Sequence, residues 1–423
     1  MNKKENAAEY AAEKVSYKDV LKQKEYLKIM MAGLINRFGD SIDAIAFTWM
    51  VYAITGSAAW SALIFAVNQL PSVLVQPFAG AMVERMDKKR LMVITDVIRG
   101  IITAGLAVLY LKGIVNPWIL LGFTLINSTV EAFRLPASLA VVPKILDKKY
   151  YEYGIALSST LSTVVQLIGL GAAGVIIGAL GIGTAIAIDG ISFFGSALIL
   201  SFLKIKNEKN AVTSKESEAF WGILKEGFVY LKEQPVIRNF CLLAVLINAV
   251  VVPLNSLQTP LVQEVLGQGS ELLSVFSIAL TVGMGIGSFV YPFVSSKLSV
   301  RTLFIGSGIM VGISMYSYTW GEKFQEHVAG IYALTVAASF ILGMACSILT
   351  SALSVQCMKV VKQEYLARVG AIFNAGASAA MPAASFLTSA LVAFCPVSQI
   401  FRFCALFCVI IFLAMAIVKV RLE

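Results

Sequence analysis

The sequence has little charge for its length, and this scarcity excludes most classes of soluble protein. Only 14% of its 423 residues are charged and 58% are hydrophobic, whereas soluble domains are usually about a quarter charged and half apolar. The single histidine and the six cysteines show no metal-ligand spacing. The sequence also has no nucleotide-binding loop and no nucleophile constellation, so we expect neither an enzyme nor an ATP-driven pump, and no cofactor or metal.

What the chain has instead is a series of long apolar segments. Each contains 19 to 28 mostly apolar residues, which meets the roughly 20 residues that a helix needs to cross about 30 Å of hydrocarbon. The pattern predicts an all-α membrane protein with twelve transmembrane helices. The predicted spans lie at about residues 30–54, 60–83, 91–111, 117–141, 154–179, 182–203, 237–262, 272–296, 302–320, 328–355, 366–393 and 398–418.

The distribution of basic residues predicts the orientation of these spans. If both termini are cytoplasmic, 28 of the 34 lysine and arginine residues lie in, or within two residues of, the inner segments. Such a bias follows the positive-inside rule. The net charge of +9 then reflects orientation and contact with anionic lipid, and it gives no support to nucleic-acid binding. We therefore expect a multi-pass protein of the cell membrane, without a cleaved signal before the first span.

One long polar break divides the spans six and six. We expect a cytoplasmic N-terminal segment at 1–29, a six-helix bundle at 30–203, a cytoplasmic linker at 204–236, a second bundle at 237–418 and a short cytoplasmic tail at 419–423. Within the linker, Phe220, Leu224, Phe228 and Leu231 recur at helical spacing, which predicts an amphipathic helix at the inner interface.

The second half also echoes the first. The sequence VQPF at 75–78 and the sequence VYPF at 290–293 each lie near the end of the second span of their half, and a charged turn follows both. This agreement in position favours two pseudo-symmetric bundles, because many transporters are built from such repeats.

The first span carries three charged residues in a segment otherwise suited to lipid. They are Arg37, Asp40 and Asp43, in NRFGDSIDAIAFTWMVY, and each costs roughly 2.5 to 3.5 kcal/mol at the centre of a bilayer. At 1.5 Å per residue the two aspartates lie about 15 to 20 Å in from residue 30, near the middle of the membrane. Asp40 and Asp43 lie on one face of the predicted helix, and this face must therefore contact protein or water rather than lipid.

Further charges in the third and fourth spans could neutralise one another. Asp96 and Arg99 stand three residues apart and can pair on one helix face, as can Glu131 and Arg134. Counted at 1.5 Å per residue along their spans, Arg37 and Glu131 lie at similar depths, so these two residues could also pair between helices.

A carboxyl group in a membrane cavity is costly when ionised and cheap when protonated, so it can exchange a proton with either side. Asp40, Asp43 and Glu131 are the candidates for this coupling role. Pairing with an arginine is an equally good account of Asp40 and Glu131. It is a weaker account of Asp43, which has no basic residue within one helical turn.

A basic junction at residues 77–100 joins the second and third spans, with the sequence PFAGAMVERMDKKRLMVITDVIRG. We expect one helix to arrive, a charged connection from Glu84 to Arg90 to turn the chain, and a second helix to begin at Leu91. So short a connection can join only antiparallel neighbours.

This junction resembles the loop between spans 2 and 3 of the major facilitator superfamily. The family pattern is Gly, three residues, Asp, Arg, any residue, Gly, then basic residues. The matching positions are Gly80, Arg85, Lys88, Lys89 and Arg90, while Glu84 stands for the Asp and Asp87 for the second Gly. The resemblance implies a gate in which Glu84 and Arg85 help to close the inner face, with Asp96 and Arg99 in the span that follows. A solvated loop with positive-inside lysines is the alternative, and transport by an Arg85→Ala variant would distinguish the two.

Nearly the whole chain resembles the drug and macrolide efflux branch of this superfamily. The supporting stretches are RFGDSIDAIAFTWMVYAITGS, AFRLPASLAVVPKIL, AIDGISFFGSALIL and EGFVYLKEQPVIRNF. The resemblance implies two six-helix bundles, a central cavity, alternating access and proton-driven export of a hydrophobic or amphipathic small molecule. The implied partners are this substrate, protons and membrane lipid, and the implied state is a monomer.

Two other functions stay open from the sequence. An exporter or flippase of a lysophospholipid or a siderophore would use the same fold with a different cavity. A non-transporting sensor or scaffold is the alternative from another class, and it would be expected to carry a large soluble domain. The longest polar segments of this chain have only about 30 residues.

Overall fold

The computed structural model describes residues 17–205, 235–323, 327–360 and 366–418. The described residues are almost entirely helical and contain no strand, as expected where lipid cannot satisfy backbone hydrogen bonds and each segment must satisfy its own. The amphipathic helix predicted at 220–231 and the two outermost segments of the chain, 1–16 and 419–423, lie outside the described residues.

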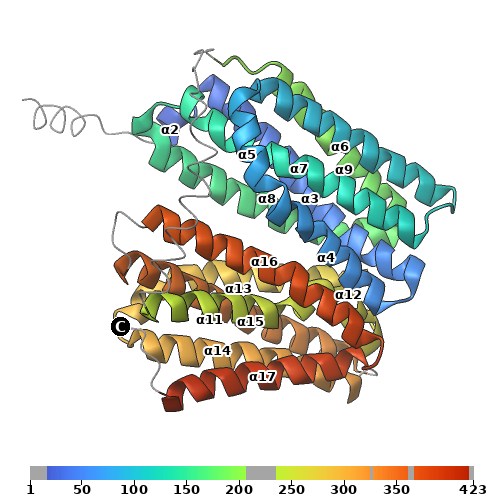
Figure 1. Cartoon of the computed structure of the whole chain (residues 1–423). Helices are drawn as coiled ribbons and strands as arrows, with labels where there is room; N and C mark the ends of the chain where they lie inside the picture. The colour runs from blue at the N-terminus through green and yellow to red at the C-terminus, as the bar shows by residue number, and fades with distance from the viewer. Residues whose placement is uncertain (1–16, 206–234, 324–326, 361–365, 419–423) are drawn as a thin grey trace, which may run out of the picture.

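The helices form two layers, one from each half of the sequence (Figure 1). The first layer contains α2 (Tyr17–Val20), α3 (Lys24–Thr55), α4 (Ala58–Leu74), α5 (Gln76–Arg85), α6 (Lys88–Leu111), α7 (Pro117–Ile145), α8 (Tyr151–Leu180) and α9 (Ile182–Ser201). The second contains α11 (Pro235–Ser256), α12 (Gln258–Pro260), the π-helical turn η2 (Leu261–Val265), α13 (Ser270–Ser295), α14 (Val300–Ser317), α15 (Val328–Val360), α16 (Leu366–Val392) and α17 (Val397–Val418).

Within the described residues these helices make twelve crossings, six in each layer, because α4 with α5 and α11 with α12 and η2 each form one crossing. Seven of the helices are individually long and apolar enough to span a membrane, and the bent pair at residues 242–265 makes an eighth. Neither α3 nor α7, which carry charged residues at mid-depth, is among the seven. The twelve predicted spans therefore agree with the helices, and the prediction of the fold class is confirmed.

Turns alternate between the two ends of the molecule. We call the end where α3 begins and α17 ends the terminal end, and the opposite end the distal end; Figure 1 shows α2 and the last turn of α17 on the same side. At the distal end, Gly56 ends α3 with a φ of 57° and donates its N–H to the Tyr52 carbonyl oxygen. Glycine is common in this left-handed position after a helix, since it has no side chain to clash.

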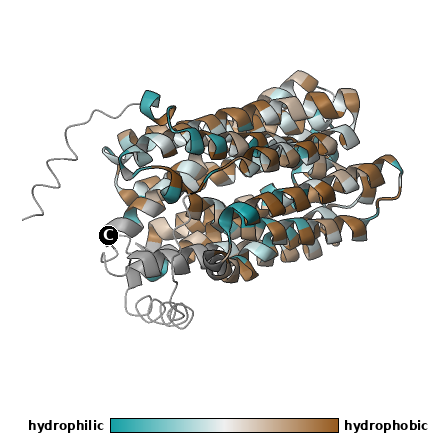
Figure 2. Ribbon diagram, turned by 90° about the horizontal axis from the view of Figure 1, so that it is seen from above, coloured by the Kyte–Doolittle hydropathy of each residue, from teal (hydrophilic) through white to brown (hydrophobic). Residues whose placement is uncertain are grey.

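The outer surface of the layers is apolar (Figure 2). Large hydrophobic side chains are exposed along the helices, among them Val175 at 69%, Ile191 at 68% and Phe289 at 72%. A soluble monomer rarely exposes so much apolar surface, but a bilayer covers it.

The basic junction is tighter than the sequence predicts. Helix α5 continues to Arg85 and α6 begins at Lys88, so the turn comprises only Met86 and Asp87. The Asp87 carboxylate accepts a hydrogen bond of 3.1 Å from the Arg90 backbone N–H and caps α6. The predicted connection from 84 to 90 was therefore too long, because both helices include charged residues, and an aspartate cap replaces the glycine of the family pattern.

Two crossings that the sequence predicts as continuous are broken. The first breaks at Val75, between α4 and α5, and the second breaks at Leu257, where α11 and the segment from Gln258 to Val265 meet at 57°. Pro77 and Pro260 follow these breaks and have no N–H for the helical ladder. Apolar runs show where a helix can cross a membrane, but they do not show how straight it is.

The two halves hold each other at the distal end. Ser385 and Ser389 of α16 donate hydrogen bonds to the carbonyl oxygens of Ala62 and Ala59 in α4, at 2.7 and 2.8 Å. The Tyr52 hydroxyl at the end of α3 donates to the Glu264 carboxylate in η2 at 2.5 Å.

A second seam between the halves joins α8 and α13. A Cβ atom placed on Gly174 would lie 2.7 Å from the Ser274 Oγ atom, so the two backbones approach as closely as glycine allows. Glycines in α8 thus let the two halves pack closely along this seam. Within the described residues, the side-chain hydrogen bonds between the halves lie in the distal part of the molecule, except for one from Gln69 of α4 to the Met381 sulfur of α16, which lies nearer mid-height.

Candidate functional site

A cavity of about 410 Å³ lies between the two halves. Helices α3, α4, α6 and α7 form one wall, and the break between α11 and α12 forms the other. The three carboxyl groups predicted to couple transport to protons line it, together with the predicted cavity residue Arg37 and with Arg99; the charged members are Arg37, Asp40, Asp43, Arg99 and Glu131. Among the described residues, those that the second half contributes are all neutral, namely Asn255, Ser256, Gln258, Thr259 and Pro260.

Arg99 is the electrostatic centre of the charged wall. Its Nη2 atom lies 3.3 Å from the Asp40 Oδ1 atom and 3.6 Å from the Glu131 Oε2 atom. Its Nε atom donates to the Asn127 side chain at 3.2 Å, and the guanidinium stacks on the Phe193 ring at 4.1 Å. Only 6% of the Arg99 side chain is exposed, so the arginine is fixed in place between two carboxylates.

The predicted pair of Arg37 with Glu131 is wrong. Arg37 donates instead to the Gln166 side-chain oxygen of α8 at 2.7 Å, while Glu131 pairs with Arg99. Helices α3 and α8 approach closely about one helical turn from this contact, where a Cβ on Gly169 would lie 2.7 Å from the Ser41 Cβ atom. Counting residues along the spans placed the two charges at similar depths but could not show which way each helix faces.

Asp43 has no such partner. Its Oδ1 atom is buried without a hydrogen bond, and we find no ion pair to Asp43 within the described part of the chain. A second buried acid, Asp189 of α9, lies within electrostatic range of Asp43 and Asp40. Asp189 is 2% exposed and accepts a hydrogen bond of 3.3 Å from Ser192. An acid pair therefore lies behind the charged wall.

Sequence analysis missed Asp189, because it gave no reason to place the sixth span beside the first. A local signal was present in Gly39, which precedes Asp40. A Cβ atom at Gly39 would lie 2.5 Å from the Asp189 Oδ1 atom, so α3 is in close contact with α9 at this point.

A second buried ion pair lies nearer the terminal end. Arg134 of α7 donates to both carboxylate oxygens of Asp96 in α6. Asp96 is completely buried and also accepts hydrogen bonds from Ser196 at 2.6 Å and Asn36 at 3.3 Å. The predicted pairing of Asp96 with Arg99 along one helix is therefore wrong, because each residue pairs across helices. Asp96 ties α3, α6, α7 and α9 together.

A side pocket of about 310 Å³ adjoins the central cavity at Arg37 and Asp40. It lies among α3, α7 and α8 and extends to Tyr26 and Ile29, which are within the first two turns of α3. The polar space around Asp40 thus reaches toward the terminal end, whereas the halves are closed against each other at the distal end.

The predicted gate residues are only partly described. Arg90 and Asp87 form an exposed ion pair of 3.5 Å at the turn, and pairs of this kind contribute at most about 1 kcal/mol. Lys88 and Lys89 begin α6. Gly80, Glu84 and Arg85 lie in α5, but their side chains are outside the described residues. Their gating role stays a prediction.

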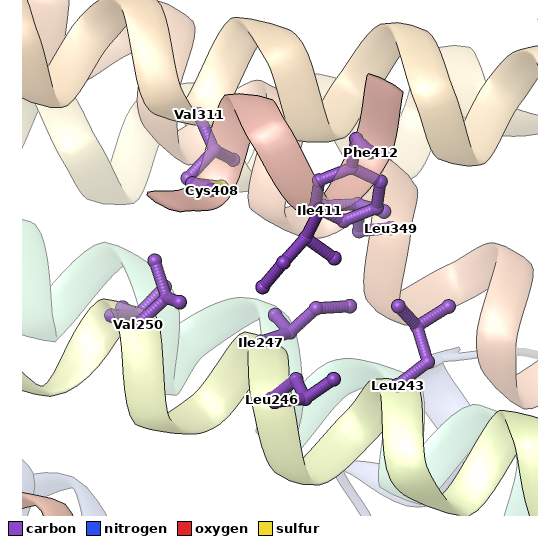
Figure 3. Close-up of a pocket in the computed structure, with 10 residues that line it drawn as sticks. Leu243, Leu246, Ile247, Val250, Val311, Leu349, Cys408, Ile411 and Phe412 are labelled. Atoms are coloured by element: carbon purple, nitrogen blue, oxygen red, sulfur yellow. The ribbon is translucent and has the colours of Figure 1, made fainter. Parts of the chain in front are cut away.

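A small apolar cavity lies inside the second half, away from the charges (Figure 3). It measures about 10 Å³ and is lined entirely by apolar residues and Cys408, with Leu243, Ile247 and Val250 on α11 facing Ile411 and Phe412 on α17. A space this small and apolar has room for no more than about one water and offers it no polar partners. It is a packing gap and not a ligand site.

Comparison with known proteins supplies the family. A family model described as "Transmembrane secretion effector" matches residues 17–423. The multidrug efflux pump Tap of Mycolicibacterium fortuitum is 23% identical over 68% of this chain and 72% of its own length. Macrolide efflux protein A of Streptococcus pyogenes is 23% identical over 79% of this chain and 81% of its own length.

Among solved structures, the nucleoside transporter NupG superposes with a TM-score of 0.75 over 93% of this chain and 99% of its own, at 14% identity. This likeness concerns the fold alone. The family match covers the two layers and the charged cavity between them, and it comes with relatives that are membrane transporters. The chain belongs to the transmembrane secretion effector family, within the major facilitator superfamily of secondary transporters.

Proposed function

We propose that this transporter exports a hydrophobic or amphipathic small molecule in exchange for protons. The observation that carries the proposal is Asp43, a carboxyl group that lines the central cavity with a buried oxygen and no ion-pair partner within the described residues. Such a group is cheap to protonate and costly to ionise, so it can bind a proton from one side and release it to the other. The drug and macrolide efflux relatives support the direction of transport and the kind of substrate.

The coupling scheme assigns different tasks to the buried charges. Asp43 binds the proton, because a negative charge on Asp43 would be opposed by the neighbouring acid Asp189. Arg99 lies between Asp40 and Glu131 and offsets part of their negative charge, whereas Asp43 is left free to bind and release the proton. The bundles at 30–203 and 237–418 rock as units about the cavity, which opens alternately at the terminal and distal ends.

Reconstituted liposomes test this proposal directly. With the lumen one pH unit more acidic than the medium, transporter molecules whose cytoplasmic face points outward should accumulate radiolabelled ethidium in the lumen, because each proton that leaves supplies about 1.4 kcal/mol. Ethidium is a permanent cation, so an acidic lumen does not trap it by protonation. One proton per substrate allows accumulation of about tenfold. Collapsing the gradient with nigericin and potassium should abolish it. Accumulation that survives nigericin, or that follows a sodium gradient instead, would exclude proton antiport.

We also propose that the terminal end is cytoplasmic. The turns at this end hold most of the lysine and arginine residues, as the positive-inside rule requires. In a variant without native cysteines, Ile114→Cys in an exposed distal turn should react with an impermeant maleimide in intact cells. Asp147→Cys, equally exposed at the terminal end, should react only after the cells are opened. The reverse pattern of labelling would invert the orientation.

A further inference from the structure

Three oxygen atoms in the wall of the central cavity are buried without a hydrogen-bond partner. They are Asp43 Oδ1, Ser61 Oγ and Thr259 Oγ1. Leaving a buried polar atom unpaired costs about 1 to 3 kcal/mol, and native proteins contain few such atoms. Three such residues line one cavity from three different elements, so a molecule in the cavity could supply the missing partners once these side chains turn toward it.

The three oxygens lie at two heights. Asp43 is 12 residues before the distal end of α3, and Ser61 is three residues after the distal start of α4. At 1.5 Å per residue, the two side chains are separated by roughly 13 Å along the helix axes. Thr259 belongs to α12, which contacts both α3 and α4 near the distal end. The cavity therefore has a charged floor at Asp43 and a hydroxyl roof at Ser61 and Thr259.

The roof and the floor differ in chemistry. The roof includes the amides of Asn255 and Gln258 but none of the charged cavity residues. Hydroxyl and amide groups can both donate and accept, so the roof suits a neutral hydrogen-bonding group such as a hydroxyl, a carbonyl or an amide.

Between floor and roof the cavity wall has an apolar side, next to the polar residues Thr48 and Asn68. Phe47, Val51 and Ile64 line the apolar side, and the Phe47 ring is fixed by a tilted stack on Phe123, with centroids 5.4 Å apart. An apolar chain fits this middle section, because burying it there removes hydrocarbon from water.

From these contacts we propose that the cavity binds its substrate lengthwise, and that the substrate is an elongated amphipathic amine with a neutral hydrogen-bonding group at its far end. The protonated nitrogen lies at Asp43, the apolar body lies against Phe47 and Ile64, and the far group bonds the Ser61 and Thr259 hydroxyls. This inference rests on the proposed function, in which Asp43 faces the substrate path. Ser61 and Thr259 thereby determine specificity.

The roof also links the two halves through the substrate. Ser61 belongs to the first half and Thr259 to the second, and the two halves contact each other near the roof through α4 and α12. A far group that hydrogen-bonds to both hydroxyls holds the distal end closed. Release of the substrate at that end then requires the hydrogen bond to Ser61 or the one to Thr259 to break.

Binding of two matched series of ligands to the transporter in lipid nanodiscs tests the proposal. One series consists of ω-amino-1-alcohols with six to twelve carbons, and the other of 1-aminoalkanes of the same lengths, measured by calorimetry at pH 8 against empty nanodiscs. At the length that spans floor to roof, the terminal hydroxyl should raise affinity roughly three- to tenfold, although it makes the ligand more polar. Ser61→Ala and Thr259→Val should each remove this gain.

Thr335→Val is the matched control. Thr335 is another buried hydroxyl without a partner, but it is not among the residues that line the cavity, so its removal should leave the gain intact. Alkylamines that bind as tightly as amino alcohols at every length would show that the roof hydroxyls hold water only. Failure of both series to bind would exclude the proposed substrate class. Neither binding result depends on a pH gradient. The binding experiment therefore tests the substrate class, and the liposome experiment tests proton-driven export independently of it.

Discussion

Replacing Asp43 with asparagine should reduce accumulation driven by a pH gradient from about tenfold to none. Asparagine has nearly the shape of a protonated aspartate but cannot release a proton, so the cavity can still alternate while the exchange of charge is lost. In liposomes with a gradient of one pH unit, the wild type should concentrate substrate by about tenfold. The variant should bring it only to equal concentrations on both sides, and counterflow of labelled substrate should continue.

The control for this experiment is Asp147→Asn, which removes an exposed carboxylate at the terminal end and should leave accumulation unchanged. A different result would reassign the coupling group. If Asp43→Asn still concentrates substrate with the same dependence on the gradient, coupling belongs to Asp40 or Glu131, or transport is not driven by protons.

Replacing Asp96 with leucine should destabilise the folded protein by about 3 to 5 kcal/mol, the usual cost of removing one partner of a buried ion pair. The change leaves the Arg134 guanidinium, which is 15% exposed, without its carboxylate. It also removes the acceptor for Ser196 and Asn36. Unfolding of purified protein in mixed detergent micelles, followed by circular dichroism, measures the loss.

The second partner makes this test specific. Arg134→Met combined with Asp96→Leu should recover much of the lost stability, because no charge is then left buried. Asp87→Ala, which removes an exposed cap at the start of α6, should cost only about 0.5 to 2 kcal/mol. A double variant as unstable as Asp96→Leu would mean that the hydrogen bonds of Asp96, and not its charge, hold the four helices together.

Much of the fold could be predicted from hydropathy, because a membrane leaves the backbone few alternatives to a helix of about 20 residues. All twelve apolar segments correspond to helices. The breaks at Val75 and Leu257 could not be predicted, since a proline in an apolar segment is compatible with both a kink and a full interruption.

The candidate site was predictable in composition but not in pairing. Placing Asp40, Asp43 and Glu131 in one cavity required only their depth and the need to keep charge away from lipid. Assigning Arg99 to Asp40, and Arg134 to Asp96, required the rotation of four helices about their axes. A spacing of three residues identifies side chains that can pair along one helix. In this structure the charged residues pair with residues of other helices instead. Asp189 was missed for the same reason.

The hydrogen bonds between α4 and α16 have a consequence for the speed of transport. Ser385 and Ser389 bond to main-chain oxygens, and such oxygens recur at every residue of a helix. The contact therefore demands no particular side chain on α4, and a slide of one turn, about 5.4 Å, offers equivalent acceptors. Each bond contributes only about 1 kcal/mol, so parting the helices meets a low, smooth barrier. The α4–α16 contact by itself therefore sets only a small barrier to separating the two halves at the distal end.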